Sequence, residues 1–221
     1  MKKTIGNPNK TNEDLINLIR KTKINNYYLK NQKDFRDRIL NEINPNDHVL
    51  DIGMAMRDRH KKINSELLET LDVNDFGEYP DIICDICSDI SGLENKYNKI
   101  ICIAILEHVY DPFSAVANLK RMLKNDGVIY GYVPYLFPYH APNDLKFQDY
   151  LRFSKDALAY LFREFSDVEL FPVRGRISTP LNIMFGLNWL IDILCHSFSD
   201  SLQSSLFFRC CSSMSSLDCP W

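Results

Sequence analysis

The sequence predicts an α/β fold, in which helices cover both faces of a doubly wound, mostly parallel sheet. Two observations predict it: short apolar runs that end near an acidic residue recur along the chain, and stretches with helical spacing lie between them. Such alternation is typical of parallel strands joined by right-handed crossovers. In a sheet of this kind, ligands bind beyond the carboxyl ends of the strands.

Helices are predicted where apolar residues recur at three- and four-residue spacing. Asn12 is a candidate N-cap for the first helix, and a second covers residues 33–43, before turn residues at 44–47. A weak helical pattern follows at Leu67 and Leu68. The next helix begins at Asp111 with a proline in its first turn. An amphipathic helix is predicted over residues 187–194.

Strands are predicted from apolar runs bounded by turn residues. They cover residues 48–52, 71–73, 80–86, 98–105, 128–133 and 165–171, and residues 206–210 are a candidate for the last strand. Acidic residues, a glycine and a histidine fall at the ends of the first four runs, where a parallel sheet brings them to one edge. These residues are Asp51, Gly53, Asp72, Asp85, Glu107 and His108.

Composition and charge fit one domain with extensions. The chain has 221 residues, of which 45 % are hydrophobic and 25 % charged, so it is long enough for a substantial core. The net charge of -3 argues against a nucleic-acid-binding protein. Residues 1–40 carry ten Lys and Arg against four Asp and Glu. We interpret them as a solvated basic arm, in preference to a docking surface for an acidic partner or a membrane.

Cysteine usage and the start of the chain indicate a cytoplasmic protein. The seven cysteines are an odd number and are scattered, unlike a secreted disulfide framework. Residues 1–10 are polar, so no signal peptide is predicted. Residues 181–194 are the most apolar late stretch. They are too few to span a membrane, which leaves a peripheral membrane contact open at this C-terminal helix.

The row of residues at the strand ends predicts a site for an adenosine-containing cofactor. A glycine directly after a strand lets the backbone approach a ligand, and an acid about 20 residues further on, here Asp72, can accept hydrogen bonds from two ribose hydroxyls. Asp85 can accept one from the exocyclic amine of adenine, because an ionised carboxylate is purely an acceptor. Gly53 stands without the G-x-G-x-x-G spacing of a nicotinamide-linked oxidoreductase.

A series of motifs carries a family resemblance. They are residues 49–53 (VLDIG), Asp85, residues 105–112 (ILEHVYDP), residues 119–127 (LKRMLKNDG) and Val133-Pro134. In this order they resemble class I S-adenosylmethionine-dependent methyltransferases of the type-11 kind. Residues 140–144 (HAPND) and 149–154 (DYLRFS) are similar to a subgroup associated with glycan and cell-surface polysaccharide synthesis. The resemblance extends over residues 35–175.

The resemblance implies a seven-stranded, Rossmann-like methyltransferase sheet with S-adenosylmethionine bound across its carboxyl edge. Residues 45–178 would form this core, after a basic N-terminal helical extension (1–44) and before a C-terminal helix and a Ser- and Cys-rich tail (179–221), in which the last strand is expected. The residues implied to bind the cofactor are Asp51, Gly53 and Met54 beside the methionine moiety, Asp72 and Val73 at the ribose, Asp85 and Ile86 at the adenine, and Ile103, Leu106 and Glu107 closing the methionine side.

The resemblance further implies transfer of a methyl group to a small-molecule or glycan acceptor, with a hydroxyl of a sugar or glycan precursor expected. The alternative is a catalytically inactive protein that keeps the fold as a binding or scaffold subunit. Its motivation is the turn after the first strand, where Ala55 and Arg57 stand in place of the second and third glycines of the family's G-x-G-x-G. The sequence indicates no oligomeric state.

Four residues are candidates for acceptor chemistry: His108, His140, Asp144 and Arg152. His108 either acts as a base facing the methyl group or caps or orients the following helix. His140 and Asp144 lie after the fifth strand, on a loop that could form a lid over an acceptor. Arg152 either binds an anionic group of the substrate or forms a salt bridge with Asp149 or Asp144.

Two further patterns are assigned to packing. Cys84 and Cys87 form a C-x-x-C without a second pair at suitable spacing, so a buried structural role is favoured and no metal site is predicted. Tyr130 and Tyr132 alternate on a predicted strand and are expected in the core. Three later aromatic residues remain candidates for a sugar-binding face: Tyr135, Phe137 and Tyr139.

Overall fold

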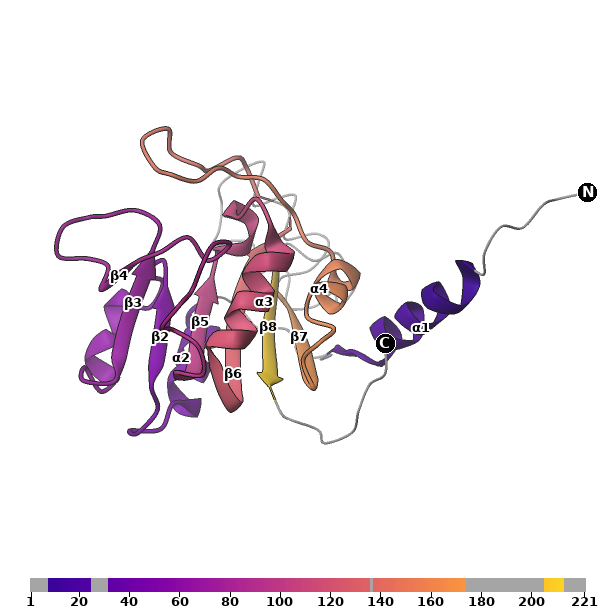
Figure 1. The fold of residues 1–221 in the computed structure, drawn as a ribbon, viewed down its shortest axis with the longest axis horizontal. Helices are drawn as coiled ribbons and strands as arrows, with labels where there is room; N and C mark the ends of the chain where they lie inside the picture. Colours follow the sequence, from indigo (N-terminus) through magenta and orange to yellow (C-terminus); the bar gives the residue numbers. More distant parts are fainter. Residues whose placement is uncertain (1–7, 25–31, 136, 174–204, 213–221) are drawn as a thin grey trace, which may run out of the picture.

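A computed structural model describes residues 8–24, 32–135, 137–173 and 205–212 (Figure 1). The helices are α1 (Pro8–Lys21), α2 (Gln32–Glu42), α3 (Pro112–Met122) and α4 (Lys155–Leu161), with 3-10 helices η1 (Arg57–Lys62) and η2 (Leu106–His108). The strands are β1 (Lys23–Ile24), β2 (Val49–Ile52), β3 (Leu68–Asp72), β4 (Ile82–Ile83), β5 (Tyr97–Ile103), β6 (Leu123–Pro134), β7 (Asp167–Val173) and β8 (Ser205–Ser212). None of the helices in these ranges is long and apolar enough to cross a bilayer.

All of these strands belong to one sheet, in the order β1-β7-β8-β6-β5-β2-β3-β4. Five of the seven strand pairings are parallel, whereas β8 runs antiparallel to both β6 and β7. The sheet is therefore mixed, and it has one strand more than the seven expected. The additional strand is β1, because Lys23 and Ile24 pair with Glu169 and Leu170 at the β7 edge.

Helices cover both faces of this sheet (Figure 1). On one face α3 and α4 pack into a core that includes Leu50 and Ile100. On the other face α2 packs into a second core with Val49 and Ile101. Neighbouring residues of β2 and β5 thus point to opposite cores, as the two-residue period of a strand requires. This arrangement is the doubly wound architecture that the sequence predicts.

Some elements differ from the sequence-based expectation. The helical pattern predicted at Leu67 and Leu68 is wrong: Leu68 opens β3, where it pairs with Val49 of the neighbouring strand. Helix α1 begins at Pro8 rather than at Asn12, since a proline is well tolerated in the first turn. The helix predicted over residues 187–194, and the membrane contact expected at residues 181–194, lie outside the described residues.

The strand β8 contains the candidate last strand, residues 206–210, and fills the space between β6 and β7. Its Phe208 is fully buried and covers Gly131 of β6, where an added Cβ would lie 2.0 Å from Phe208 Cζ. Arg209 donates a hydrogen bond from Nε to Glu42 of α2 at 3.1 Å. The C-terminal region and the N-terminal extension therefore both take part in the central sheet.

The carboxyl ends of β2, β3, β4, β5 and β6 point to the same edge of the sheet, because these five neighbouring strands are parallel. The loops after β3 and β6 extend beyond that edge, at the top of Figure 1. α1, in contrast, extends from the far side of the molecule, next to the β1 and β7 edge (Figure 1). The basic N-terminal helix thus lies away from the loops that could form a site (Figure 1).

Candidate functional site

A cavity of about 370 Å³ lies at the carboxyl edge of the sheet, beyond β2, β3 and β5. Its volume is in the range of about 300–1,000 Å³ that is usual for small-molecule sites. The wall combines strand ends with residues of the loop after β6, namely Lys146 and Phe147. It includes seven of the predicted site residues: Gly53, Asp72, Val73, Asp85, Ile86, Ile103 and His108.

The turn after β2 lets the backbone come close to the cavity. Gly53 has a φ of +71°, and an added Cβ would lie 2.4 Å from Ile105 Cδ1. Met54 follows with a φ of 58°, in a left-handed region that non-glycine residues adopt rarely. Ala55 lines the cavity and is not among the residues with positive φ. An alanine at the family's second glycine is therefore compatible with this turn.

A second left-handed residue lies directly after β5. Ala104 has a φ of 55° and lines the cavity. Non-glycine residues in this conformation cost free energy and concentrate at functional sites. Met54 and Ala104 thus place strained backbone directly after two neighbouring strands, and Ala104 lies on the cavity wall itself.

Asp51 lies behind the turn and not on the cavity wall, where the sequence interpretation placed it. It is fully buried, and its Oδ2 accepts a hydrogen bond from the Met56 backbone N–H at 3.0 Å and lies 2.7 Å from His60 Nε2. The contacts with Met56 and His60 lower the pKa of Asp51, but burial outweighs them and raises it overall. Asp51 therefore fixes the loop that leads into η1. Met54 and the fully buried Leu106 also lie outside the cavity wall.

Asp72 lies at the end of β3, on the cavity wall. Its Oδ1 accepts hydrogen bonds from the backbone N–H and the side-chain amide of Asn74, at 2.8 and 3.1 Å. Asn74 Oδ1 accepts in turn from the Lys146 backbone N–H at 2.8 Å. One buried asparagine thus orients the acid and ties the loop after β6 to the end of β3. Sequence reasoning missed Asn74, because nothing in its local pattern distinguishes it from a turn residue.

Asp85 follows β4 on the same wall. Its Oδ1 accepts from the Cys87 N–H at 2.8 Å, and its Oδ2 accepts from the Tyr110 hydroxyl at 3.2 Å. Cys84 and Cys87 are free, half-buried thiols, and burial raises the pKa of Cys87 to about 11. The Cys87 thiol donates to the Asp111 carbonyl at 3.4 Å. These contacts agree with a structural role for the C-x-x-C.

Arg36 is a wall residue that sequence reasoning missed. It comes from α2 and reaches the cavity from outside the motif region. Its Nε is buried and has no hydrogen-bond partner within the described part of the chain. The signal that could have found it is its place in the sequence, one residue after the buried Phe35. A guanidinium on the wall with a buried, unpartnered Nε provides a binding point for an anionic group.

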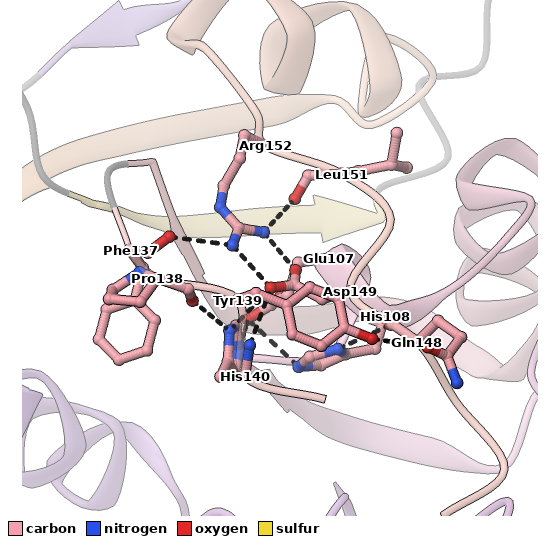
Figure 2. A network of polar contacts seen from close by, with 10 residues as sticks. All are labelled: Glu107, His108, Phe137, Pro138, Tyr139, His140, Gln148, Asp149, Leu151 and Arg152. Carbon is pink, nitrogen blue, oxygen red and sulfur yellow. Dashed lines mark hydrogen bonds and ion pairs between the residues drawn. The ribbon is translucent and has the colours of Figure 1, made fainter. Parts of the chain in front are cut away.

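A cluster of polar side chains adjoins the cavity, and Figure 2 shows it from close by. We call Glu107, His108, His140, Asp149 and Arg152 the Glu107 cluster. Glu107 is fully buried, and both of its carboxylate oxygens are without a hydrogen-bond partner in the described ranges. Burial raises the pKa of Glu107 to about 8. Glu107 Oε1 lies 3.9 Å from His140 Nε2 and 4.0 Å from His108 Nε2.

The two imidazoles of the cluster have defined tautomers. His108 Nδ1 lies 2.9 Å from the Gln148 carbonyl. His140 Nδ1 lies 3.1 Å from the Pro138 carbonyl and 3.0 Å from Asp149 Oδ2. All three partners are acceptors, so each Nδ1 carries a proton, and each ring turns its Nε2 toward Glu107. Burial lowers the pKa of His108, which favours its neutral form.

Of the two interpretations of Arg152, the structure shows the salt bridge. Arg152 binds both carboxylate oxygens of Asp149, with Nη2 2.7 Å from Oδ2. It also donates to the carbonyls of Phe137 and Leu151, at 3.2 and 2.8 Å. The hydrogen bond from Arg152 lowers the pKa of Asp149 to about 2. Arg152 thus holds the loop after β6 in place, as Figure 2 shows.

The structure also places the other residues that the sequence singled out. His108 does not cap α3, because Asp111 does so by accepting from the N–H groups of Phe113 and Ser114. Asp144 is exposed and is not part of the cavity wall. Tyr130 and Tyr132 are buried, as predicted. Three aromatic side chains are exposed at 37, 53 and 63 %, respectively: Tyr135, Phe137 and Tyr139.

Known structures identify the fold, although sequence comparison does not. No protein-family model and no curated protein matches the chain. The CurJ carbon methyltransferase aligns with a TM-score of 0.52 and 13 % identity, over 82 % of this chain and 55 % of that chain. Phosphoethanolamine N-methyltransferase 2 of Haemonchus contortus, in complex with S-adenosylhomocysteine, aligns with a TM-score of 0.51 and 14 % identity, over 80 % of this chain and 52 % of that chain. An S-adenosylmethionine-dependent methyltransferase of Thermotoga maritima aligns with a TM-score of 0.51 and 8 % identity, over 92 % of this chain and 95 % of that chain.

The chain therefore has the Rossmann-like fold of S-adenosylmethionine-dependent methyltransferases. It spans about half the length of the CurJ and Haemonchus contortus proteins. At these identities the similarity concerns the fold, and the chemistry depends on the residues of the cavity and the Glu107 cluster.

Proposed function

We propose that the protein is an S-adenosylmethionine-dependent methyltransferase. The observation that carries the proposal is the order of residues on the cavity wall: the Gly53 turn after β2, Asp72 after β3 and Asp85 after β4. They lie on a fold shared with methyltransferases, one of which is in complex with S-adenosylmethionine. The positions follow the sequence of methionine, ribose and adenine that the cofactor presents along a sheet edge.

The wall residues fit this cofactor chemically. Arg36, with its unpartnered buried Nε, would hold the methionine carboxylate. Asp72 would accept from the ribose hydroxyls and Asp85 from the adenine amine. Val73 and Ile86 give the adenine end apolar walls. The bound cofactor would supply a methyl group activated by a sulfonium, and what the protein adds is position and the exclusion of water.

His108 is the candidate base of this site. It lines the cavity, and its unprotonated Nε2 is held in orientation by the hydrogen bond from Nδ1 to the Gln148 carbonyl. A hydroxyl acceptor loses its proton when it is methylated, and a neutral imidazole within reach can take that proton. His108 would thus act on the acceptor directly, whereas Arg152 holds the loop after β6 in position.

We further propose a hydroxyl of a sugar or glycan precursor as the acceptor. Phe137 packs edge-on against the His140 ring at 4.9 Å between centroids, and it is 53 % exposed. Tyr139 is exposed beside it, with its hydroxyl bound to Gln148. Exposed aromatic rings with polar groups beside them suit ligands that are apolar on one face and polar at the edge. This surface supports the proposal because it adjoins His140 of the Glu107 cluster.

Cofactor binding tests the first step. Isothermal titration with S-adenosylmethionine is expected to show binding, and Asp72→Asn should weaken it by about 1–3 kcal/mol through the lost charged hydrogen bonds. Asp75→Asn is the matched control, because Asp75 is exposed and binds only within its own turn in the described structure. Absence of binding at millimolar cofactor, or equal affinities of the two variants, would contradict the proposal.

Methyl transfer tests the second step. Incubation of the chain with methyl-labelled S-adenosylmethionine and glycan or sugar-nucleotide extracts should label an acceptor, and His108→Ala should reduce labelling more than cofactor affinity. Cofactor binding without transfer to any acceptor would favour the alternative, a catalytically inactive binding or scaffold protein.

A further inference from the structure

The Glu107 carboxylate has no donor to pair with in the described structure. It is fully buried, with both oxygens unpartnered. The nearest side-chain nitrogens, Nε2 of His140 and Nε2 of His108, lie 3.9 and 4.0 Å from Oε1. Nδ1 of each ring faces an acceptor, so Nε2 is the nitrogen that the neutral form of each ring offers to a ligand. Two imidazole nitrogens and a buried carboxyl group, all of them metal-ligand types, therefore face one another without a hydrogen bond between them.

We propose that Glu107, His108 and His140 bind one divalent transition-metal ion through a carboxylate oxygen and two imidazole nitrogens. One ligand atom from each of the three side chains lies within 4.8 Å of the others. Ligand atoms at about 2.0–2.1 Å from a tetrahedral ion stand about 3.4 Å apart. Small side-chain movements of about 1 Å would therefore bring them to bonding distance.

Contacts around the two histidines match those of metal ligands. His108 donates from Nδ1 to the Gln148 carbonyl, and His140 Nδ1 is paired with Asp149, which Arg152 holds in turn. Metal-ligating histidines almost always donate their second ring N–H to a carbonyl or carboxylate in this manner. This feature is independent of the unpaired Glu107 carboxylate, because it lies on the opposite side of each imidazole.

The donor set indicates the class of metal. Two imidazoles and one carboxylate suit Zn²⁺, Co²⁺, Fe²⁺ or Ni²⁺, whereas Mg²⁺ and Ca²⁺ prefer oxygen ligands. Three protein ligands leave at least one coordination position for water or a substrate oxygen. His108 also lines the cavity, so the ion would lie beside it and occupy the Nε2 lone pair that His108 has as a base only in the metal-free protein. Metal binding at this place does not depend on the proposed function and is testable without cofactor or acceptor.

Titration of the metal-free chain with Co²⁺, whose visible absorption reports its coordination, tests the proposal. One equivalent should bind. His140→Ala and Glu107→Gln should each weaken binding by at least about 100-fold, since loss of even an outer partner costs about 10- to 100-fold. Asp149→Asn should weaken Co²⁺ binding by about 10- to 100-fold, because Asp149 is such an outer partner of His140. Binding that is absent, or that survives both His140→Ala and Glu107→Gln unchanged, overturns the proposal.

Two controls make the titration specific. His48→Gln removes a histidine at the opposite end of β2 and should leave Co²⁺ affinity unchanged. The double variant Cys84→Ser and Cys87→Ser should also bind Co²⁺ as the wild type does; a loss there would assign the ion to the thiols and overturn the proposal. His140 is 27 % exposed at its side chain, so its variant remains informative if Glu107→Gln fails to fold.

The proposal and the proposed function can fail separately. Titration with S-adenosylmethionine in the presence of a chelator tests the cofactor site alone, and the Co²⁺ titration without cofactor tests the metal site alone. Loss of Co²⁺ binding in His140→Ala with unchanged cofactor affinity is the expected result.

Discussion

Gly53 lies on the cavity wall and has a backbone conformation that favours glycine. Its φ of +71° and the 2.4 Å approach of an added Cβ to Ile105 Cδ1 are two separate penalties for any larger residue. Gly77 has a similar φ of +86°, yet nothing lies within 4 Å of an added Cβ there. The two glycines thus separate the cost of conformation from the cost of contact.

Alanine substitutions at these glycines give the first stability prediction. Gly77→Ala should cost about 1–2 kcal/mol, because of its left-handed backbone alone. Gly53→Ala should cost about 0.5–1.5 kcal/mol more, because the end of the Ile105 side chain must turn away from the added methyl group. Urea unfolding monitored by circular dichroism measures both values. Equal losses of stability would show that Ile105 moves away at no cost.

The same turn shows what sequence can reveal about a single residue. Ala55 and Arg57 were the positions at which the motif departed from its family, yet Ala55 has no positive φ and Arg57 is exposed. The unusual conformation is at Met54. A motif records which residues stand in a turn, but the φ of each depends on where the chain leads next, here to the contact of Asp51 with the Met56 N–H.

Glu42 joins three elements, α2, β6 and β8. Its Oε2 accepts from the Tyr130 hydroxyl at 2.7 Å and from Arg209 Nε at 3.1 Å. Burial disfavours the charged carboxylate, but the hydrogen bonds from Tyr130 and Arg209 outweigh it and lower the pKa of Glu42. An acid with a lowered pKa contributes stability above its ordinary pKa of about 4.3, and that contribution is lost as the pH falls through the lower folded value.

This junction predicts a pH-dependent effect. Glu42→Gln should lower the free energy of unfolding by about 1–3 kcal/mol at pH 7. The difference from the wild type should shrink below about pH 4, where the carboxylate becomes protonated. Urea unfolding at both pH values measures it, with the exposed Glu66→Gln as control. A difference that does not change with pH would mean that the carboxylate charge is not involved.

At the level of elements, local patterns predicted the buried strands best. The predicted runs 48–52 and 98–105 contain or largely overlap β2 and β5, because a strand covered on both faces is apolar throughout. The two-residue β1 was not predicted, since its pairing with β7 depends on a contact far along the sequence. The position of β8 between β6 and β7 has the same non-local origin.

The molecule as a whole depends on that late strand. Phe208 of β8 is fully buried, covers Gly131 and packs against the Phe162 ring at 4.5 Å between centroids. It therefore connects β6, β8 and the residue that ends α4. Because β8 lies between β6 and β7, the sheet is complete only when this strand is in place.

Truncation of this side chain predicts a global effect. Phe208→Ala should cost about 3–5 kcal/mol, a large share of the roughly 5–15 kcal/mol that a domain possesses. Near- and far-ultraviolet circular dichroism in urea should shift together to lower denaturant, because the whole sheet is affected. Phe76→Ala, on a ring that is 52 % exposed, is the control. Two separate transitions would show that β8 unfolds on its own.

The shared position of His108 has a consequence for the molecule as a whole. One imidazole belongs both to the cavity wall and to the Glu107 cluster, so the two occupancies form a linked equilibrium. Any ligand of the cavity that displaces this ring must change the cation affinity of the cluster, and the cation must change the affinity of that ligand by the same factor. The sign and size of that coupling free energy are measurable from the two titrations combined.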